Sequence, residues 1–129
     1  MAFERFTLTG KSYRPKISIR SNGQIGFNQG AIERFGLNNY KFAVLFYDRD
    51  QKIIGIKLTN QDEDGACTLQ VRKSNAAISA KAFLDYFDIN YSKTKRYDAK
   101  YDEQEKMITA ELNKPNKEEI IYIAPKDDE

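Results

Sequence analysis

The sequence predicts a mainly β domain with two short α-helices, in which two similar strand-strand-helix-strand-strand units share one core. The first observation is a recurrence: segment 47–58, YDRDQKIIGIKL, is repeated fifty-four residues later as segment 101–112, YDEQEKMITAEL, with five of twelve positions identical. The second is the alternation of apolar and polar residues in 16–20 and 68–72, the period of a half-buried strand. Units of this length rarely bury their own apolar face, so two copies are expected to close around one interior.

In the first unit, a glycine turn joins two strands and a short helix follows. Residues 21–23, Ser-Asn-Gly, suit a hairpin turn because Asn and Gly adopt positive φ at low cost. Asn28 is expected to cap a helix over 29–35, and Gly36 to end it in the left-handed region. The nearly continuous apolar run 40–47 then predicts a strand covered on both faces, followed by a turn and a partner strand.

The second unit is expected to repeat this order. Residues 73–75, Lys-Ser-Asn, follow its first strand as a turn. Ser79 is the expected N-cap of a helix over 80–87, whose apolar stripe is typical of core packing. Segments 96–101 and 106–112 are expected to form the closing hairpin, which is more polar than its counterpart.

The length of 129 residues fits one domain. Its expected parts are an N-terminal arm over 1–15, a first repeat over 16–59, a second repeat over 66–112, and a C-terminal strand or tail over 113–129. The apolar segment 120–123 is the candidate for an added edge strand.

The residue types that the chain lacks argue against catalysis. It has no His and a single Cys, so it has no His general base, no Ser-His-Asp or Cys-His arrangement and no usual zinc ligand set. It also has no Walker loop and no GxGxxG motif. We expect no enzyme activity, no cofactor and no metal site, and we expect Cys67 to be a small buried apolar residue.

The remaining composition favours a soluble protein of the cytoplasm. No apolar run approaches the roughly 18 residues that a membrane span requires, and the first residues lack the apolar stretch of a secretory signal. The net charge is +2, but residues 1–41 carry seven Lys or Arg against two Glu. This uneven distribution is compatible with a positive face that binds nucleic acid, and equally with the ordinary scatter of charge on a solvated surface.

Around Gly23 the sequence resembles the AbrB/MazE/MraZ-like (SpoVT-AbrB) family of swapped-hairpin barrels. The residues that carry the resemblance are the turn and strand of 23–28, GQIGFN, followed by Phe35-Gly36-Leu37 at the family's spacing. Most members build the barrel from two chains, whereas the MraZ type carries two copies in one chain. This sequence is similar to the second arrangement over about residues 16–112, which implies a small β-barrel of two pseudo-symmetric repeats.

The resemblance also implies double-stranded DNA as a partner, because family DNA binders place Arg residues on the first strand, after the turn glycine and in the short helix. In this chain Gln24 stands where the turn Arg is expected, and a Gln side chain can pair with an adenine edge in the major groove. The expected DNA-binding residues are Lys16, Arg20, Gln24, Arg34, Arg72, Lys73 and Lys81.

Two other interpretations stay open. Instead of a small transcription-regulator-like protein that binds DNA, the chain could be a barrel that has lost DNA binding and acts as an interaction or oligomerisation module, with edge strands that pair two copies into a homodimer. Residues Phe3, Phe6 and Tyr13 and segment 120–123 would cover those edges. The carboxylates at the two Tyr-Asp turns, Asp48 with Asp50 and Asp102 with Glu103, could serve acid-base chemistry, but Asp is common in turns for its backbone hydrogen bonds.

Overall fold

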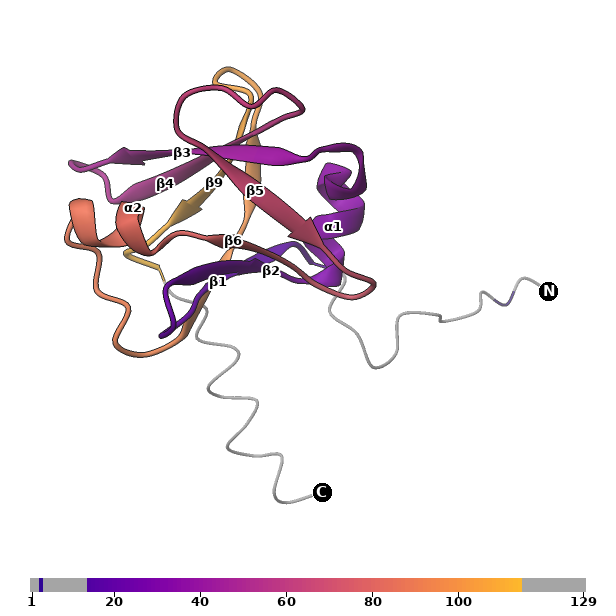
Figure 1. The fold of residues 1–129 in the computed structure, drawn as a ribbon. Helices are drawn as coiled ribbons and strands as arrows, with labels where there is room; N and C mark the ends of the chain where they lie inside the picture. Colours follow the sequence, from indigo (N-terminus) through magenta and orange to yellow (C-terminus); the bar gives the residue numbers. More distant parts are fainter. Residues whose placement is uncertain (1–2, 4–13, 115–129) are drawn as a thin grey trace.

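Nine antiparallel strands form a nearly closed barrel in the computed structural model, which describes Phe3 and residues 14–114 (Figure 1). The strands are β1 (Lys16–Ile19), β2 (Gln24–Phe27), β3 (Phe42–Asp48), β4 (Ile53–Thr59), β5 (Ala66–Val71), β6 (Ala76–Ser79), β7 (Lys95–Asp98), β8 (Lys100–Asp102) and β9 (Met107–Glu111). The helices are α1 (Gln29–Phe35), the 3₁₀ turn η1 (Leu37–Asn39) and α2 (Lys81–Tyr86). The prediction of a mainly β barrel with two short α-helices is therefore confirmed.

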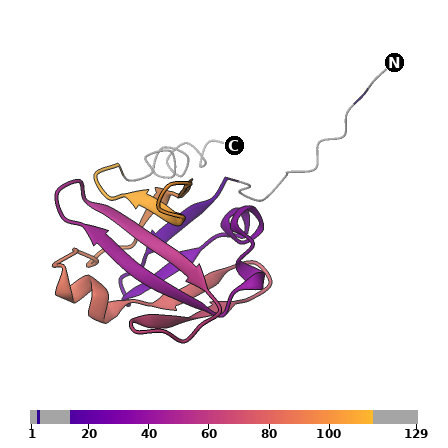
Figure 2. The same cartoon turned by 90° about the horizontal axis from the view of Figure 1, so that it is seen from above.

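The strand order explains how the barrel closes. Neighbouring strands follow the order β7-β1-β2-β6-β5-β3-β4-β9-β8. The two ends of this order, β7 and β8, are consecutive in the chain and are separated only by Ala99. One bent segment therefore pairs with β1 through its first part and with β9 through its second, and Figure 2 shows the strands wrapping around one interior.

The two Tyr-Asp hairpins have the same strand register. In the β3–β4 hairpin Tyr47 lies opposite Ile54, and in the β8–β9 hairpin Tyr101 lies opposite Ile108. Both isoleucines are fully buried. Each hairpin therefore directs a corresponding Ile side chain into the common interior.

The turns of these hairpins also match. Asp48 Oδ1 accepts hydrogen bonds from the backbone N–H groups two and three residues later, at 2.9 and 3.0 Å. Asp102 Oδ1 accepts the corresponding pair at 2.9 and 3.1 Å. Lys52 and Lys106 then adopt positive φ angles of 60° and 57°. These aspartates stabilise turns, as Asp side chains commonly do.

Each α-helix packs against the hairpin that is distant from it in sequence. The ring centroid of Phe35, at the end of α1, lies 6.3 Å from that of Tyr101. Phe87, just after α2, lies 5.2 Å from Tyr47. The two contacts are reciprocal, since the helix of residues 16–59 meets the hairpin of 66–112 and the helix of 66–112 meets the hairpin of 16–59.

The core is drawn from both segments of the chain. Its largest fully buried side chains are Ile17, Ile19, Ile25, Phe27, Leu37, Ile54, Ile56, Ile78, Leu84 and Ile108. Alternate residues of β1 and β2 supply four of these side chains, as the period-two pattern predicts.

The expected ends of α1 are confirmed. Asn28 caps the helix, because its Oδ1 accepts a hydrogen bond from the backbone N–H of Ala31 at 2.9 Å. Gly36 ends it with φ 64°, and its N–H bonds to the carbonyl of Ile32. A seven-residue helix is marginal by itself, so these bonds and its buried face hold it in place.

Three local expectations are wrong. Ser79 does not cap α2: it belongs to β6, where it pairs with Gln24, and Ala80 occupies the N-cap position without a side-chain bond. The strand expected over 96–101 is broken at Ala99, because its two parts pair with different neighbours. Strand β3 is not covered on both faces, since Phe46 is 44 % exposed.

Some expectations concern residues outside the described part. These are the contribution of Phe6 and Tyr13 to sheet edges, the added strand around 120–123, and most of the arm and tail. Phe3 is described and is 89 % exposed. Within 14–114, neither α-helix has the length and apolar character that a membrane span needs.

Candidate nucleic-acid interface

Strand register divides the expected DNA-binding residues between two ends of the sheet. Gln24 lies opposite Ser79, and three residues further along, Phe27 lies opposite Ala76. The β1–β2 turn therefore adjoins the start of α2, whereas the β5–β6 turn adjoins the start of α1 (Figure 1). Three residues of strand correspond to about 10 Å, so the two turns lie at opposite ends of these strands rather than side by side.

At the β1–β2 end, Arg20 and Gln24 bind each other. Nη1 of Arg20 donates to Oε1 of Gln24 at 3.0 Å, and Nδ2 of Asn22 donates to the same oxygen at 3.4 Å. The guanidinium lies over Gly26, where any Cβ would collide with it. The Gln24 carbonyl oxygen therefore already accepts hydrogen bonds within the turn, and the absence of a side chain at Gly26 leaves room for the Arg20 guanidinium.

Lys81 lies at the same end because α2 starts against Gly23. The N–H of Ala80 donates to the carbonyl of Gly23 at 2.9 Å. Nζ of Lys81 donates to the Tyr91 hydroxyl at 2.9 Å, and that hydroxyl donates to Asp85 Oδ1 at 2.7 Å. The hydrogen bond to Tyr91, followed by the charge of Asp85, raises the pKa of Lys81. The ammonium is thus exposed and charged, with an acidic residue beside it.

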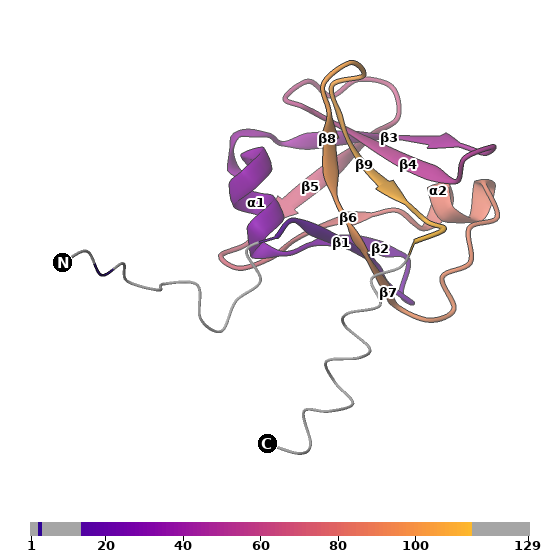
Figure 3. The same ribbon diagram turned by 180° about the vertical axis from the view of Figure 1, so that it is seen from behind.

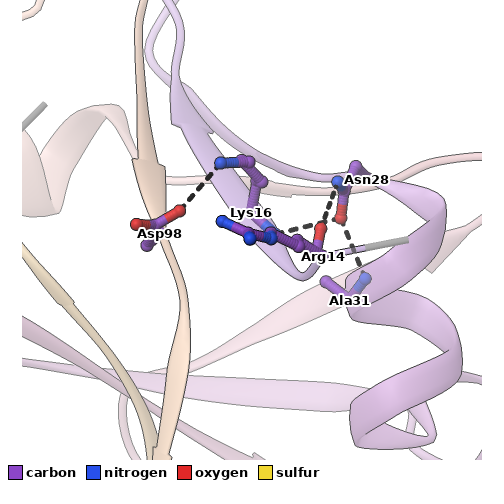
Figure 4. A network of polar contacts seen from close by, with 5 residues as sticks. All are labelled: Arg14, Lys16, Asn28, Ala31 and Asp98. Carbon is purple, nitrogen blue, oxygen red and sulfur yellow. Dashed lines mark hydrogen bonds and ion pairs between the residues drawn. The ribbon is translucent and has the colours of Figure 1, made fainter. Parts of the chain in front are cut away.

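Lys16 is placed as a structural residue. Its Nζ bonds to Asp98 Oδ1 at 2.8 Å, and its side chain is only 8 % exposed (Figure 4). Asn28 holds the adjacent backbone: it accepts from the N–H of Lys16 at 3.0 Å and donates to the carbonyl of Arg14 at 2.8 Å. Since β1 and β7 pair side by side, the Lys16 ammonium faces Asp98 rather than open solvent.

The remaining expected residues are exposed. Arg34 lies in the last turn of α1, and Arg72 and Lys73 lie in the β5–β6 turn. Within residues 14–114 none of the three has an ion-pair or side-chain hydrogen-bond partner among the described contacts. Arg20 also has no ion-pair partner among these residues, but its guanidinium is bonded to Gln24.

A cavity that the sequence did not reveal lies between α1 and the β7–β8 bend. Its volume is about 770 Å³. Figure 3 shows β8 with β9 on one side and α1 on the other. The lining residues are Arg14, Pro15, Arg34, Phe35, Tyr40, Leu58, Asp98, Ala99, Lys100, Tyr101, Glu103 and Lys106.

The cavity is basic and partly aromatic. Four cationic residues and two acidic residues line it, and one of the acidic groups, Asp98, is bonded to Lys16. Of these residues, Arg34 was among the expected DNA-binding residues and Glu103 was one of the carboxylates considered for acid-base chemistry. The signal that could have located the cavity is the second Tyr-Asp hairpin, which carries Lys100 and Lys106 around Tyr101, but its contact with α1 spans 66 residues of sequence.

Other reactive side chains give no site. Among residues 14–114, no group of three or more His, Cys, Asp or Glu could hold a metal ion. Cys67 is half-buried on β5 rather than fully buried, and burial raises the pKa of its thiol.

Comparison with known proteins leaves the family open. No family model, curated protein or solved structure matches this chain.

Proposed function

We propose that this chain is a tandem swapped-hairpin barrel of the AbrB/MraZ-like kind that binds double-stranded DNA as a transcription regulator. Support for the tandem arrangement comes from the strand order and from the reciprocal helix-hairpin contacts. Exchanging β1 with β5, β2 with β6, β3 with β7–β8 and β4 with β9 leaves the strand neighbours unchanged. Two units of one chain that pair in this way would occupy the places of the two chains in a dimeric barrel.

Support for DNA binding comes chiefly from the exposed basic residues near α1. Arg72 and Lys73 lie in the turn next to the start of α1, and Arg34 lies at the end of the same helix. Uncompensated Arg and Lys side chains are the groups that bind backbone phosphates and release counterions. Arg20 and Lys81, at the other end of the strands, would add contacts to a duplex that crosses both turns.

The test is a titration of duplex DNA fragments at several salt concentrations. Each phosphate contact contributes about 0.9 to the slope of log affinity against log salt. The double variant Arg72→Glu with Lys73→Glu is expected to reduce the steepness of that slope by about 2.

The matched control reverses the charge of two lysines that are already in ion pairs. Lys57 pairs with Glu63 at 3.6 Å, and Lys114 pairs with Glu111 at 3.2 Å. Lys57→Glu with Lys114→Glu changes the net charge equally, and it is expected to keep the salt slope of the unmodified protein. Equal losses in the two variants, or no binding at low salt, would contradict the proposal.

The second candidate is an interaction module, and an exposed aromatic surface favours it. Tyr86 is 72 % exposed and packs edge-on against Phe87, with ring centroids 4.8 Å apart. Sedimentation velocity tests this candidate in the homodimer form. A dimer that Tyr86→Ser converts to a monomer would support it, and a monomer at all concentrations would exclude it.

A further inference from the structure

We propose that the cavity between α1 and the β7–β8 bend binds a nucleoside monophosphate group, either as a free nucleotide or as the 5′ end of a single strand. The phosphate would bind to the lining side chains of Arg34, Lys100 and Lys106, called the basic rim below, and the base would stack on the ring of Tyr101. This inference does not depend on the binding of duplex DNA.

The rim of the cavity favours an anion. Arg34, Lys100 and Lys106 line it, and within 14–114 none of these three has an ion-pair partner among the described contacts. The Asp98 carboxylate is bonded to the Lys16 ammonium at 2.8 Å, which leaves Glu103 as the only other acidic residue of the lining. A phosphate in this cavity would meet more cationic than acidic side chains, and charge-assisted bonds to such groups are stronger than neutral ones.

The aromatic residues of the cavity favour an anion that carries a planar ring. Tyr101 is 44 % exposed, and the centre of its ring lies 6.3 Å from that of Phe35, with an interplanar angle of 34°. A partly exposed aromatic ring is a platform on which a nucleobase can stack. The volume of about 770 Å³ is within the range typical of small-molecule sites, roughly 300–1,000 Å³.

The corresponding place in the other part of the barrel shows how such a ring pair is covered. There Phe87 packs on Tyr47, and the guanidinium carbon of Arg49 lies 4.8 Å from the centre of the Phe87 ring. Arg49 directly follows the first Tyr-Asp pair. The residue that directly follows the second pair is Glu103. The Arg49 guanidinium therefore covers the Phe87 ring, the counterpart of Phe35, whereas the Phe35–Tyr101 pair lines a basic cavity.

The experiment is isothermal titration of the full chain at low salt with AMP, adenosine and inorganic phosphate as separate probes. AMP is expected to bind at least about tenfold more tightly than either fragment, because only AMP uses both the rim and the ring. Tyr101→Leu, and Lys100→Glu with Lys106→Glu, are each expected to weaken AMP binding by about tenfold or more. Tyr101→Phe keeps the ring and is expected to retain binding, which distinguishes loss of stacking from loss of fold.

Two controls decide the interpretation. Tyr86→Leu and the double variant Lys57→Glu with Lys114→Glu are expected to leave AMP binding unchanged. Equal losses in the control variants would overturn the proposal, as would AMP binding no tighter than that of phosphate if a 5′-phosphorylated strand also shows no Tyr101-dependent binding. Duplex DNA affinity should be unaffected by Tyr101→Leu, so this proposal and that of DNA binding can fail separately.

A second titration distinguishes the two sources of the group. A ten-residue thymidine strand is compared with and without a 5′ phosphate. Tighter, Tyr101-dependent binding of the phosphorylated strand than of AMP would assign the site to strand ends, and tighter binding of AMP would assign it to free nucleotides. Absence of binding by both AMP and the phosphorylated strand would overturn the proposal.

Discussion

The ion pair between Lys16 and Asp98 gives an asymmetric prediction about stability. The Lys16 side chain is 8 % exposed and the Asp98 side chain is 63 % exposed, with 2.8 Å between the charged atoms. Asp98→Ala leaves a covered ammonium without its acceptor, whereas Lys16→Met removes the charge and keeps most of the apolar stem. The first variant should therefore be much less stable than the second.

The magnitude follows from the burial of the two groups. Removing one partner of a fully buried pair costs about 3–5 kcal/mol, and deleting a hydrogen bond to a charged group costs about 1.5–3 kcal/mol. Because Asp98 is largely exposed, the lower range applies, and Asp98→Ala is expected to cost about 2 kcal/mol. Lys16→Met is expected to cost less than about 1 kcal/mol, since replacing a covered charge by an apolar side chain is often neutral.

Urea unfolding of both single variants and of the double variant measures these values. With a slope of about 2 kcal/mol per molar urea, Asp98→Ala should lower the midpoint by about 1 M. The double variant should resemble Lys16→Met, which gives a coupling energy of about 1–2 kcal/mol. Equal losses in the two single variants, with no coupling, would refute the reasoning. Lys16→Met should also leave DNA affinity unchanged.

Three further predictions concern the turns and the surface. Replacing Arg20 and Arg72 together by Ala should weaken DNA binding and flatten its salt dependence in the fragment titration, and unchanged binding would remove both from the interface. Asp88 has φ 56°, so Asp88→Gly should raise the free energy of unfolding by about 0.5 kcal/mol in urea, and a decrease would contradict the strain argument. Burial raises the pKa of the Cys67 thiol, so iodoacetamide should modify it more slowly at pH 8 than in the urea-unfolded chain. Equal rates in the two states would show that the folded thiol is not protected.

The local signals in the sequence predicted most of the fold. Asn28 and Gly36 bound α1 at the expected residues, because capping depends on side-chain and φ preferences that the sequence states directly. The failure at Ser79 has the opposite origin: its hydroxyl suits an N-cap, but the pairing of β6 with β2 keeps the residue in the strand. The break at Ala99 likewise depends on which strands pair with the segments before and after it. The sequence of this one segment does not specify those partners.

The candidate site was predictable only in part. The sequence placed Arg72 at the end of a strand and Lys73 in the turn after it; in the structure both residues are exposed in the turn between β5 and β6. Lys16 had the same charge but lies opposite Asp98, which is 82 residues away in the chain. The cavity depends on contact between α1 and the distant β8–β9 hairpin, so no stretch of sequence contains its residues together.

The central claim is that each helix packs against the distant hairpin, and nuclear Overhauser contacts between aromatic rings test it most directly. Cross-peaks are expected between the rings of Phe35 and Tyr101 and between those of Phe87 and Tyr47, with none between Phe35 and Tyr47 or between Phe87 and Tyr101. Cross-peaks between Phe35 and Tyr47 and between Phe87 and Tyr101, in place of the expected ones, would show that each helix packs on the hairpin of its own unit. That result would contradict both the reciprocal helix-hairpin packing and the basic cavity.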